Sequence, residues 1–162
     1  MKRVLVIGCP GSGKSRFSRA LAERTKLPLC HLDMLFWNAD KTTVSRDIFR
    51  ERLSSILVGE EWIIDGNYLS TMEWRMSFAD TVFFFDFPVD LCLRGVRERR
   101  GKARPDMPWI EEEDDEEFLA FIHAFEKDTR PEVLALLARH PSKNLYIFHT
   151  REEADAFLKN YI

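Results

Sequence analysis

The first 26 residues constrain the fold more than any other part of the chain. An apolar run, Val4 to Ile7, leads into the glycine-rich segment GCPGSGKS at 8–15, and a helical pattern follows at 13–25. Glycine tolerates the backbone angles that a loop needs to turn successive N–H groups inward. The following helix presents the positive end of its dipole at the same point. Strand, loop and helix in succession therefore predict a phosphate-binding site.

The loop matches the spacing G-x-x-x-x-G-K-[ST]. Lys14 is expected to contact the β- and γ-phosphates of a nucleoside triphosphate, and Ser15 to supply an oxygen ligand for Mg²⁺. We therefore predict ATP and Mg²⁺ as cofactors. The predicted nucleotide-binding residues are Gly8, Gly11, Ser12, Gly13, Lys14, Ser15 and Arg16. A GTPase is disfavoured because the sequence has no N-K-x-D stretch for guanine.

Strand-like and helix-like segments alternate along the rest of the chain. The predicted strands are 3–7, 28–32, 62–65, 81–86 and 144–149, and the predicted helices are 13–25, 44–58, 89–100, 114–127, 131–139 and 152–160. This alternation predicts a single α/β domain over 1–162 with a parallel sheet. Ligands of such sheets bind outside the carboxyl ends of the strands, so the residues that follow each strand are the candidates for function.

Two strands end in an aspartate that could serve the metal. Asp65 closes the run WIID, and we predict that it and Ser15 hold Mg²⁺. Asp86 is a rival at the end of TVFFFD, but a Phe-Pro pair follows it and Asp is a common helix cap. Asp65 is favoured because Gly66 lets the chain turn away close to the ligand.

The acceptor of the phosphate is expected near the end of the second strand. Asp33 follows LPLCHL and is placed to orient an acceptor hydroxyl or to draw off its proton. Trp37 offers a flat apolar wall for a ring, although aromatic side chains more often belong to a core. The predicted substrate-binding residues are Asp33, Trp37, Gly66, Arg75 and Arg130.

Residues 94–104, RGVRERRGKAR, hold six basic residues and one acid. Arginines stabilise the negative charge that phosphoryl transfer spreads over the transferring group. We predict that Arg97 and Arg100 point at the nucleotide and that Arg104 lies on a flap at about 101–113. A solvated helix face and a nucleic-acid patch are the alternatives. The predicted catalytic residues are Lys14, Asp33, Arg97, Arg100 and Arg104.

Seven consecutive acids at 111–117 precede the apolar pattern FLAFIHAF. Acids at a helix N-terminus favour the helix dipole, which is the preferred interpretation. The alternative is a latch that pairs with the basic flap.

The composition limits the kinds of partner that we expect the protein to bind. The 162 residues carry a net charge of −3, which argues against a direct duplex-DNA binder. Three cysteines without metal-like spacing suit a reducing compartment. The apolar run before Gly8 is short for a signal peptide, and no run approaches the length of a membrane span. We therefore expect a cytoplasmic protein with no membrane partner, and the sequence leaves the oligomeric state open.

Together these motifs resemble the adenylate-kinase-related P-loop kinases of small molecules. Within them the chain is most similar to bacterial proteins labelled "DNA topology modulation protein", through VIGCPGSGKSRFSRALAE, LPLCHLDMLFW, WIIDGNY and ADTVFFFDFPVDLCLRGVRERR. The resemblance implies a three-layer P-loop NTPase sandwich with strand order 2-3-1-4-5, a short flap, and ATP as donor. The residues that it implies are Gly8, Gly11, Gly13, Lys14 and Ser15 for phosphates, Asp33, Asp65 and Gly66 near acceptor and metal, and Arg97 and Arg100 at the flap base.

The sequence departs from nucleoside monophosphate kinases after the Asp65-Gly66 turn, where Arg75 is the first arginine. The predicted function is transfer of the γ-phosphate of Mg-ATP to a small molecule, with nucleosides and nucleotides among the candidates. The alternative is an ATP-binding regulatory module whose basic flap contacts a protein or a nucleic acid.

Overall fold

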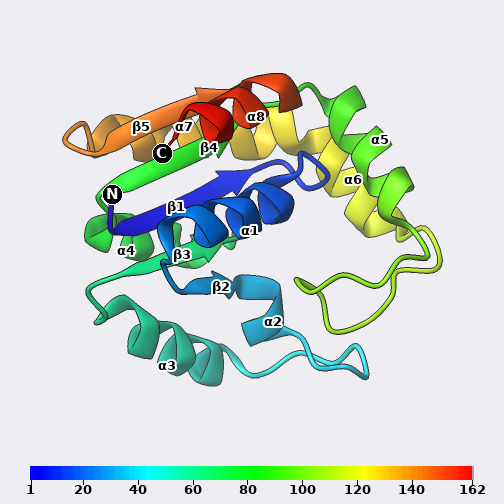
Figure 1. Ribbon diagram of the computed structural model, residues 1–162. Coiled ribbons are helices and arrows are strands. Elements are labelled where there is room, and N and C mark those ends of the chain that lie inside the picture. Colours follow the sequence, from blue (N-terminus) through cyan, green and yellow to red (C-terminus); the bar gives the residue numbers. More distant parts are fainter. Residues whose placement is uncertain (162) are drawn as a thin grey trace.

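Five strands form one parallel sheet, and helices lie on both of its faces (Figure 1). This is the usual arrangement for a parallel sheet. The computed structural model describes residues 1–161. The strand order is β2-β3-β1-β4-β5, which confirms the predicted α/β sandwich. The strands are β1 (Arg3–Gly8), β2 (Leu29–His31), β3 (Trp62–Asp65), β4 (Thr81–Phe85) and β5 (Asn144–Phe148).

The helices divide between the two faces of the sheet. Apolar side chains of α1 and α8 pack on one face, and those of α3, α4 and α7 pack on the other. None of the helices within residues 1–161 combines the length and apolarity needed to cross a bilayer. The helices are α1 (Lys14–Thr25), α2 (Leu32–Phe36), α3 (Arg46–Leu57), α4 (Leu69–Phe78), α5 (Val89–Arg99), α6 (Glu116–Ala124), the π-helix η1 (Phe125–Thr129), α7 (Arg130–Arg139) and α8 (Arg151–Asn160).

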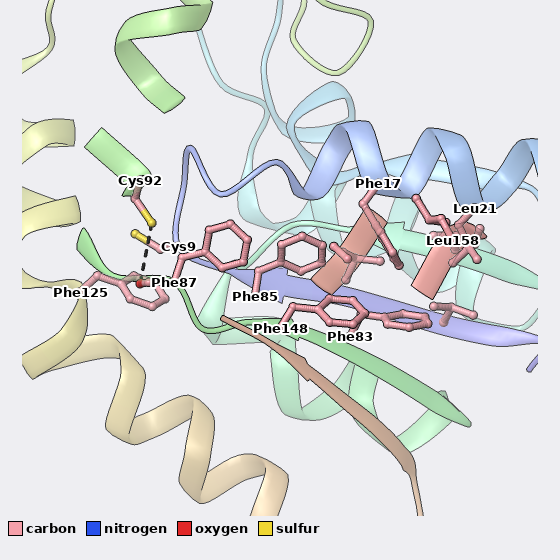
Figure 2. Packing of buried hydrophobic residues seen from close by; sticks show 14 of the residues in the cluster. Cys9, Phe17, Leu21, Phe83, Phe85, Phe87, Cys92, Phe125, Phe148 and Leu158 are labelled. Atoms are coloured by element: carbon pink, nitrogen blue, oxygen red, sulfur yellow. Dashed lines mark hydrogen bonds between the residues drawn. The ribbon is translucent and has the colours of Figure 1, made fainter. Parts of the chain in front are cut away.

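An aromatic cluster anchors the helix that follows the phosphate-binding loop. The ring of Phe17, in the first turn of α1, meets Phe83 and Phe85 of β4 edge-on, at centroid distances of 4.9 and 5.2 Å. Figure 2 shows these rings beside Phe148 and, at the other end of the cluster, the free thiol of Cys9 in the loop itself. The buried rings fix the start of α1, and with it the loop, against the sheet.

Helix α5 touches the phosphate-binding loop through backbone atoms. A Cβ added to Gly95 would lie 1.9 Å from the Gly11 carbonyl oxygen, and one added to Gly11 would lie 2.0 Å from the Cys92 carbonyl oxygen. Gly11 also has a φ of +83°, which other residues rarely adopt. Two glycines therefore allow the loop and helix to approach each other.

Two helices were absent from the prediction, and one predicted break does not occur. Helices α2 and α4 lie where the pattern suggested loops. The helix break expected before Pro131 is filled by η1, so α6, η1 and α7 follow one another without a loop. Residues 101–115 form no helix or strand, which agrees with a loop at the predicted flap, and Figure 1 shows this segment near α2.

Substitution of Gly95 by alanine tests the contact between α5 and the loop. Helix propensity alone would make Gly95→Ala stabilising by about 1 kcal/mol. We expect instead a loss of about 1–3 kcal/mol in the free energy of unfolding, because the methyl group displaces the loop, together with weaker binding of an ATP analogue. Urea denaturation and calorimetry measure these effects. Arg97→Ala, at an exposed site on the same helix, is the control, and a stabilised Gly95→Ala protein would contradict the contact.

Candidate active site

The glycine-rich loop presents backbone donors at the start of α1. Gly11 and Gly13 have φ values of +83° and +94°. Within the described part of the chain, the N–H groups of Gly11, Gly13, Lys14 and Ser15 have no hydrogen-bond acceptor. The first turn of α1 holds no acid, and no side chain caps it. This arrangement fits the phosphates of a nucleotide, because the donors and the helix dipole point to one place.

Lys14 lies over the loop that precedes it. Its Nζ donates to the Cys9 carbonyl oxygen at 3.0 Å. Burial lowers the pKa of Lys14, while the charge of Asp65 opposes this shift. A cation that has lost hydration gains more from a phosphate than an exposed one does, so the position suits contact with the transferring group.

Three side chains meet around one carboxylate oxygen beside the loop. Ser15 Oγ donates to Asp65 Oδ2 at 2.6 Å, and His31 Nδ1 lies 2.7 Å from the same oxygen. The predicted pair of Ser15 and Asp65 is thus brought together. His31 is not among the predicted site residues, and only the three-dimensional fold places it here.

The residues fit a nucleotide-bound Mg²⁺. Within residues 1–161 there is no cluster of three or more His, Cys, Asp or Glu that could hold a metal ion by itself. Magnesium bound with nucleotides needs one or two protein oxygens and takes its remaining ligands from phosphate and water. Ser15 and Asp65 suffice for that role.

The turn after β3 connects the two halves of the site. Asn67 Oδ1 accepts from the Gly8 N–H at 2.9 Å, and its Nδ2 donates to the Gly8 carbonyl at 2.6 Å. Tyr68, the next residue, donates from its hydroxyl to Asp33 Oδ1 at 2.6 Å. The sequence pointed to Asp33 but to neither of these partners.

Asp33 lies in the first turn of α2 and not at the end of a strand. Burial raises the pKa of Asp33, and the hydrogen bond from Tyr68 lowers it. Burial and the nearby charge of Asp33 also raise the pKa of Tyr68, which keeps the phenol protonated as a donor.

The prediction that Arg75 binds the acceptor is wrong, because its side chain is fully buried. Its guanidinium donates to the carbonyl of Gly66 at 3.0 Å, to that of Tyr68 at 3.2 Å, and to that of Asn67. Burial lowers the pKa of Arg75 to about 9. Arg75 therefore holds the turn at 66–68 from its buried side.

A strongly basic cavity of about 570 Å³ lies along the loop and the start of α1. Nine basic and three acidic side chains line it, among them the predicted Lys14, Arg16 and Arg104. Arg99 is also in the lining, and its buried Nε lies 3.2 Å from a Glu111 carboxylate oxygen, an ion pair without hydrogen-bond geometry. These features fit a triphosphate.

A second cavity of about 880 Å³ lies on the other side of Lys14 and Ser15. Asp33, Trp37 and Gly66, three of the residues proposed to bind the substrate, line it. Trp37 meets Trp109 of the flap edge-on, with ring centroids 4.9 Å apart. The two cavities share the loop, which is the arrangement that transfer between two ligands needs.

The arginines of the basic segment are only partly where the sequence placed them. Arg99, which was not predicted, lines both cavities, whereas Arg97 is exposed and lines neither. Arg97 and Arg99 are two residues apart, a rotation of about 200° on a helix, so α5 turns Arg99 inward while Arg97 faces solvent. Arg104 is half-buried in the nucleotide cavity, and Arg100 borders the second cavity.

Carboxylates hold these arginines in place. Glu111 lies 3.2 Å from Arg99 and 3.4 Å from Arg104, and Asp114 pairs with Arg100. Asp115 caps α6 by accepting from two backbone N–H groups. The acidic run therefore does both things that its sequence suggested, since one part caps the helix and another pairs with the flap arginines.

Arg130 does not face the nucleotide. Its guanidinium makes a bidentate contact with Asp86, at 2.7 and 2.9 Å, and it lines neither cavity. The predicted substrate contact is therefore corrected. The same pairing engages Asp86, which supports Asp65 as the metal partner.

Solved structures of small-molecule kinases share this fold. Shikimate kinase from Bacteroides thetaiotaomicron is 22% identical, with a TM-score of 0.61 over 98% of this chain and 94% of that one. Shikimate kinase from Acinetobacter baumannii, in complex with shikimate, is 18% identical, with a TM-score of 0.64 over 98% and 92%. A gluconokinase from Sinorhizobium meliloti 1021 is 18% identical, with a TM-score of 0.56 over 98% and 91%. These likenesses establish the P-loop kinase fold. No protein-family model and no curated protein matches the sequence.

Substitution of Arg75 distinguishes a supporting role from a binding one. We expect Arg75→Lys to lower the free energy of unfolding by more than about 2 kcal/mol, because an ammonium group leaves buried carbonyls without donors. Arg139→Lys, at an exposed ion pair with Glu73, should change it by less than about 0.5 kcal/mol. Urea denaturation measures both. Unchanged stability together with a raised acceptor KM would restore the binding role.

Proposed function

We propose that the protein is a phosphotransferase that moves the γ-phosphate of Mg-ATP to a hydroxyl group of a small molecule. The observation that carries this proposal is the position of Lys14 and the Ser15–Asp65 pair between two cavities, one basic and one containing Asp33. A regulatory module would need the first cavity but not the second.

The residues would act mainly by positioning and by stabilising charge. The loop N–H groups and Lys14 hold the β- and γ-phosphates. Bound Mg²⁺ neutralises charge on the phosphates, and Ser15 and Asp65 would hold it. Asp33 orients the acceptor hydroxyl and takes its proton as the new O–P bond forms and the bond to the β-phosphate oxygen breaks. Arg99 and Arg104 stabilise the transferring group.

The acceptor cavity favours some predicted acceptors over others. Trp37, Trp109 and Tyr68 line it, and these rings suit an apolar or a cationic part of an acceptor. The surrounding carboxylates oppose the phosphate of a nucleotide. Residues 101–113 would act as the flap that closes over both ligands and excludes water. The DNA link that the resemblance implied has no counterpart in the kinases named above.

Lys14→Ala tests the proposed reaction. We expect ADP formation from Mg-ATP to fall by about 10²-fold or more, because the variant lacks the charge that faces the transferring group. A coupled assay with a panel of nucleosides, sugars and amino alcohols measures it. Lys127→Ala, at an exposed site in η1, is the matched control. Full turnover by Lys14→Ala would refute the mechanism, and tight ATP binding with only slow, acceptor-independent hydrolysis would favour the regulatory module.

The pH dependence of transfer tests the role of Asp33. Transfer requires the ionised carboxylate, so the rate falls on acidification through a pKa that lies above the ordinary value of 3.8. The Tyr68 hydrogen bond lowers this pKa, so Tyr68→Phe should move the acid limb of kcat to higher pH. Tyr146→Phe, on exposed β5, should leave it in place. An acid limb that stays in place or moves downward in Tyr68→Phe would exclude Asp33 as the base.

A further inference from the structure

The two cavities on either side of the loop carry opposite charge. Nine basic and three acidic side chains line the nucleotide cavity, whereas eight acidic and four basic side chains line the acceptor cavity. A cavity with an excess of carboxylates repels an anionic ligand and attracts a cationic one. The acceptor therefore meets an electrostatic environment unlike that of the nucleotide.

The basic side chains of the acceptor cavity are mostly engaged. Arg99 pairs with Glu111 and Arg100 with Asp114. Lys14 donates to the phosphate-binding loop. Lys41 remains, at an exposed position. Arg75, the first arginine after the Asp65-Gly66 turn, is buried beneath that turn. Within the described residues each arginine in the lining is already paired with a carboxylate, so an anionic acceptor would have to displace that partner.

Several carboxylates, by contrast, are available. Glu112 and Glu113 are exposed at the rim and form no ion pair within the described part of the chain. Asp33 receives one hydrogen bond at Oδ1, from Tyr68. The negative charge is therefore placed both at the entrance and at the floor of the cavity.

Aromatic rings supply a second, independent feature that selects for a cation. Trp37 comes from the end of α2 and Trp109 from the flap, and their ring planes meet at 79°. Both side chains are half-buried and line the cavity. Indole faces attract cations more strongly than other aromatic faces do. The two rings touch edge to face, so an ammonium group would bind an indole face that this contact leaves open.

We propose that the acceptor is an amino alcohol or amino sugar, bound with its protonated amine against the tryptophan pair and the acidic rim and with its hydroxyl at Asp33. This inference rests on the proposed function and names its substrate class. The hydroxyl oxygen forms the new bond to the γ-phosphorus, its proton passes to Asp33, and ADP leaves. The amine stays protonated, so it has no lone pair with which to compete for the phosphate.

Three ligands that share a cyclohexane ring and a hydroxyl group but differ in charge test the proposal. They are trans-4-aminocyclohexanol, cyclohexane-1,4-diol and 4-hydroxycyclohexanecarboxylate, which at neutral pH are a cation, a neutral molecule and an anion. Calorimetry measures their binding to the full chain in the presence of Mg²⁺ and a non-hydrolysable ATP analogue. We expect the cation to bind about tenfold more tightly than the diol, from the rim charges and the indoles together, and the anion to bind more weakly than both.

Two double variants connect the selectivity to the rim. Glu112→Gln with Glu113→Gln should remove most of the preference for the cation while changing diol binding by less than about twofold, because only the charged ligand senses the rim. Glu23→Gln with Glu60→Gln, at exposed positions away from both cavities, makes the same change in net charge and should leave the preference intact. Equal loss in both double variants would mean that net charge, and not the rim, gives the selectivity.

The binding and transfer experiments distinguish failure of the proposed acceptor class from failure of the proposed function. Equal or tighter binding of the carboxylate, or no binding of the amine, would overturn the proposed acceptor class. Lys14-dependent transfer to shikimate or gluconate but to no amino alcohol would also overturn it, while leaving the phosphotransferase intact. Binding of the amine without Lys14-dependent transfer to any compound of the panel, shikimate and gluconate included, would overturn the proposed function itself.

Discussion

The buried guanidinium of Arg75 holds the turn on which both halves of the site depend. Three successive carbonyls, from Gly66 to Tyr68, accept from this one side chain. Tyr68 has a φ of +42°, a left-handed conformation that costs a non-glycine residue about 1–2 kcal/mol. Hydrogen bonds to a charged donor offset that cost. The turn then aims Asp65 at Ser15, Asn67 at the glycine-rich loop and the Tyr68 hydroxyl at Asp33.

The two cavities of the site differ in the sign of their charge. The loop runs between a basic cavity and an acidic one, so under the proposed function electrostatics directs the triphosphate to the first cavity and the acceptor to the second. Flap arginines that are paired with carboxylates remain folded against the site without a phosphate to hold them. The planar guanidinium group of arginine can bind a phosphate as well as a carboxylate. Exchange of one partner for the other therefore requires little rearrangement.

The sequence predicted the features of the site that depend on residues close together in the chain. The loop, the strand ends and the pair of Ser15 and Asp65 follow from motifs within a few residues of each other or from parallel strands that end at one edge. Arg75 could not be placed, because charge usually indicates exposure and only the packing of α4 reveals its burial. Arg97 was chosen over Arg99 because a run of arginines does not reveal which one a helix turns inward. His31 reaches Asp65 only through the pairing of β2 with β3.

The two cavities are linked through side chains that line both of them. Arg99 and Asp106 are shared, and Arg99 is paired with Glu111 in the wall of the acceptor cavity. Under the proposed function, a phosphate that binds Arg99 competes with Glu111 and leaves that carboxylate facing the acceptor. Nucleotide binding therefore makes the acceptor cavity more negative and strengthens its attraction for a cation. Because coupling between two binding sites is reciprocal, the cation must strengthen nucleotide binding by the same factor.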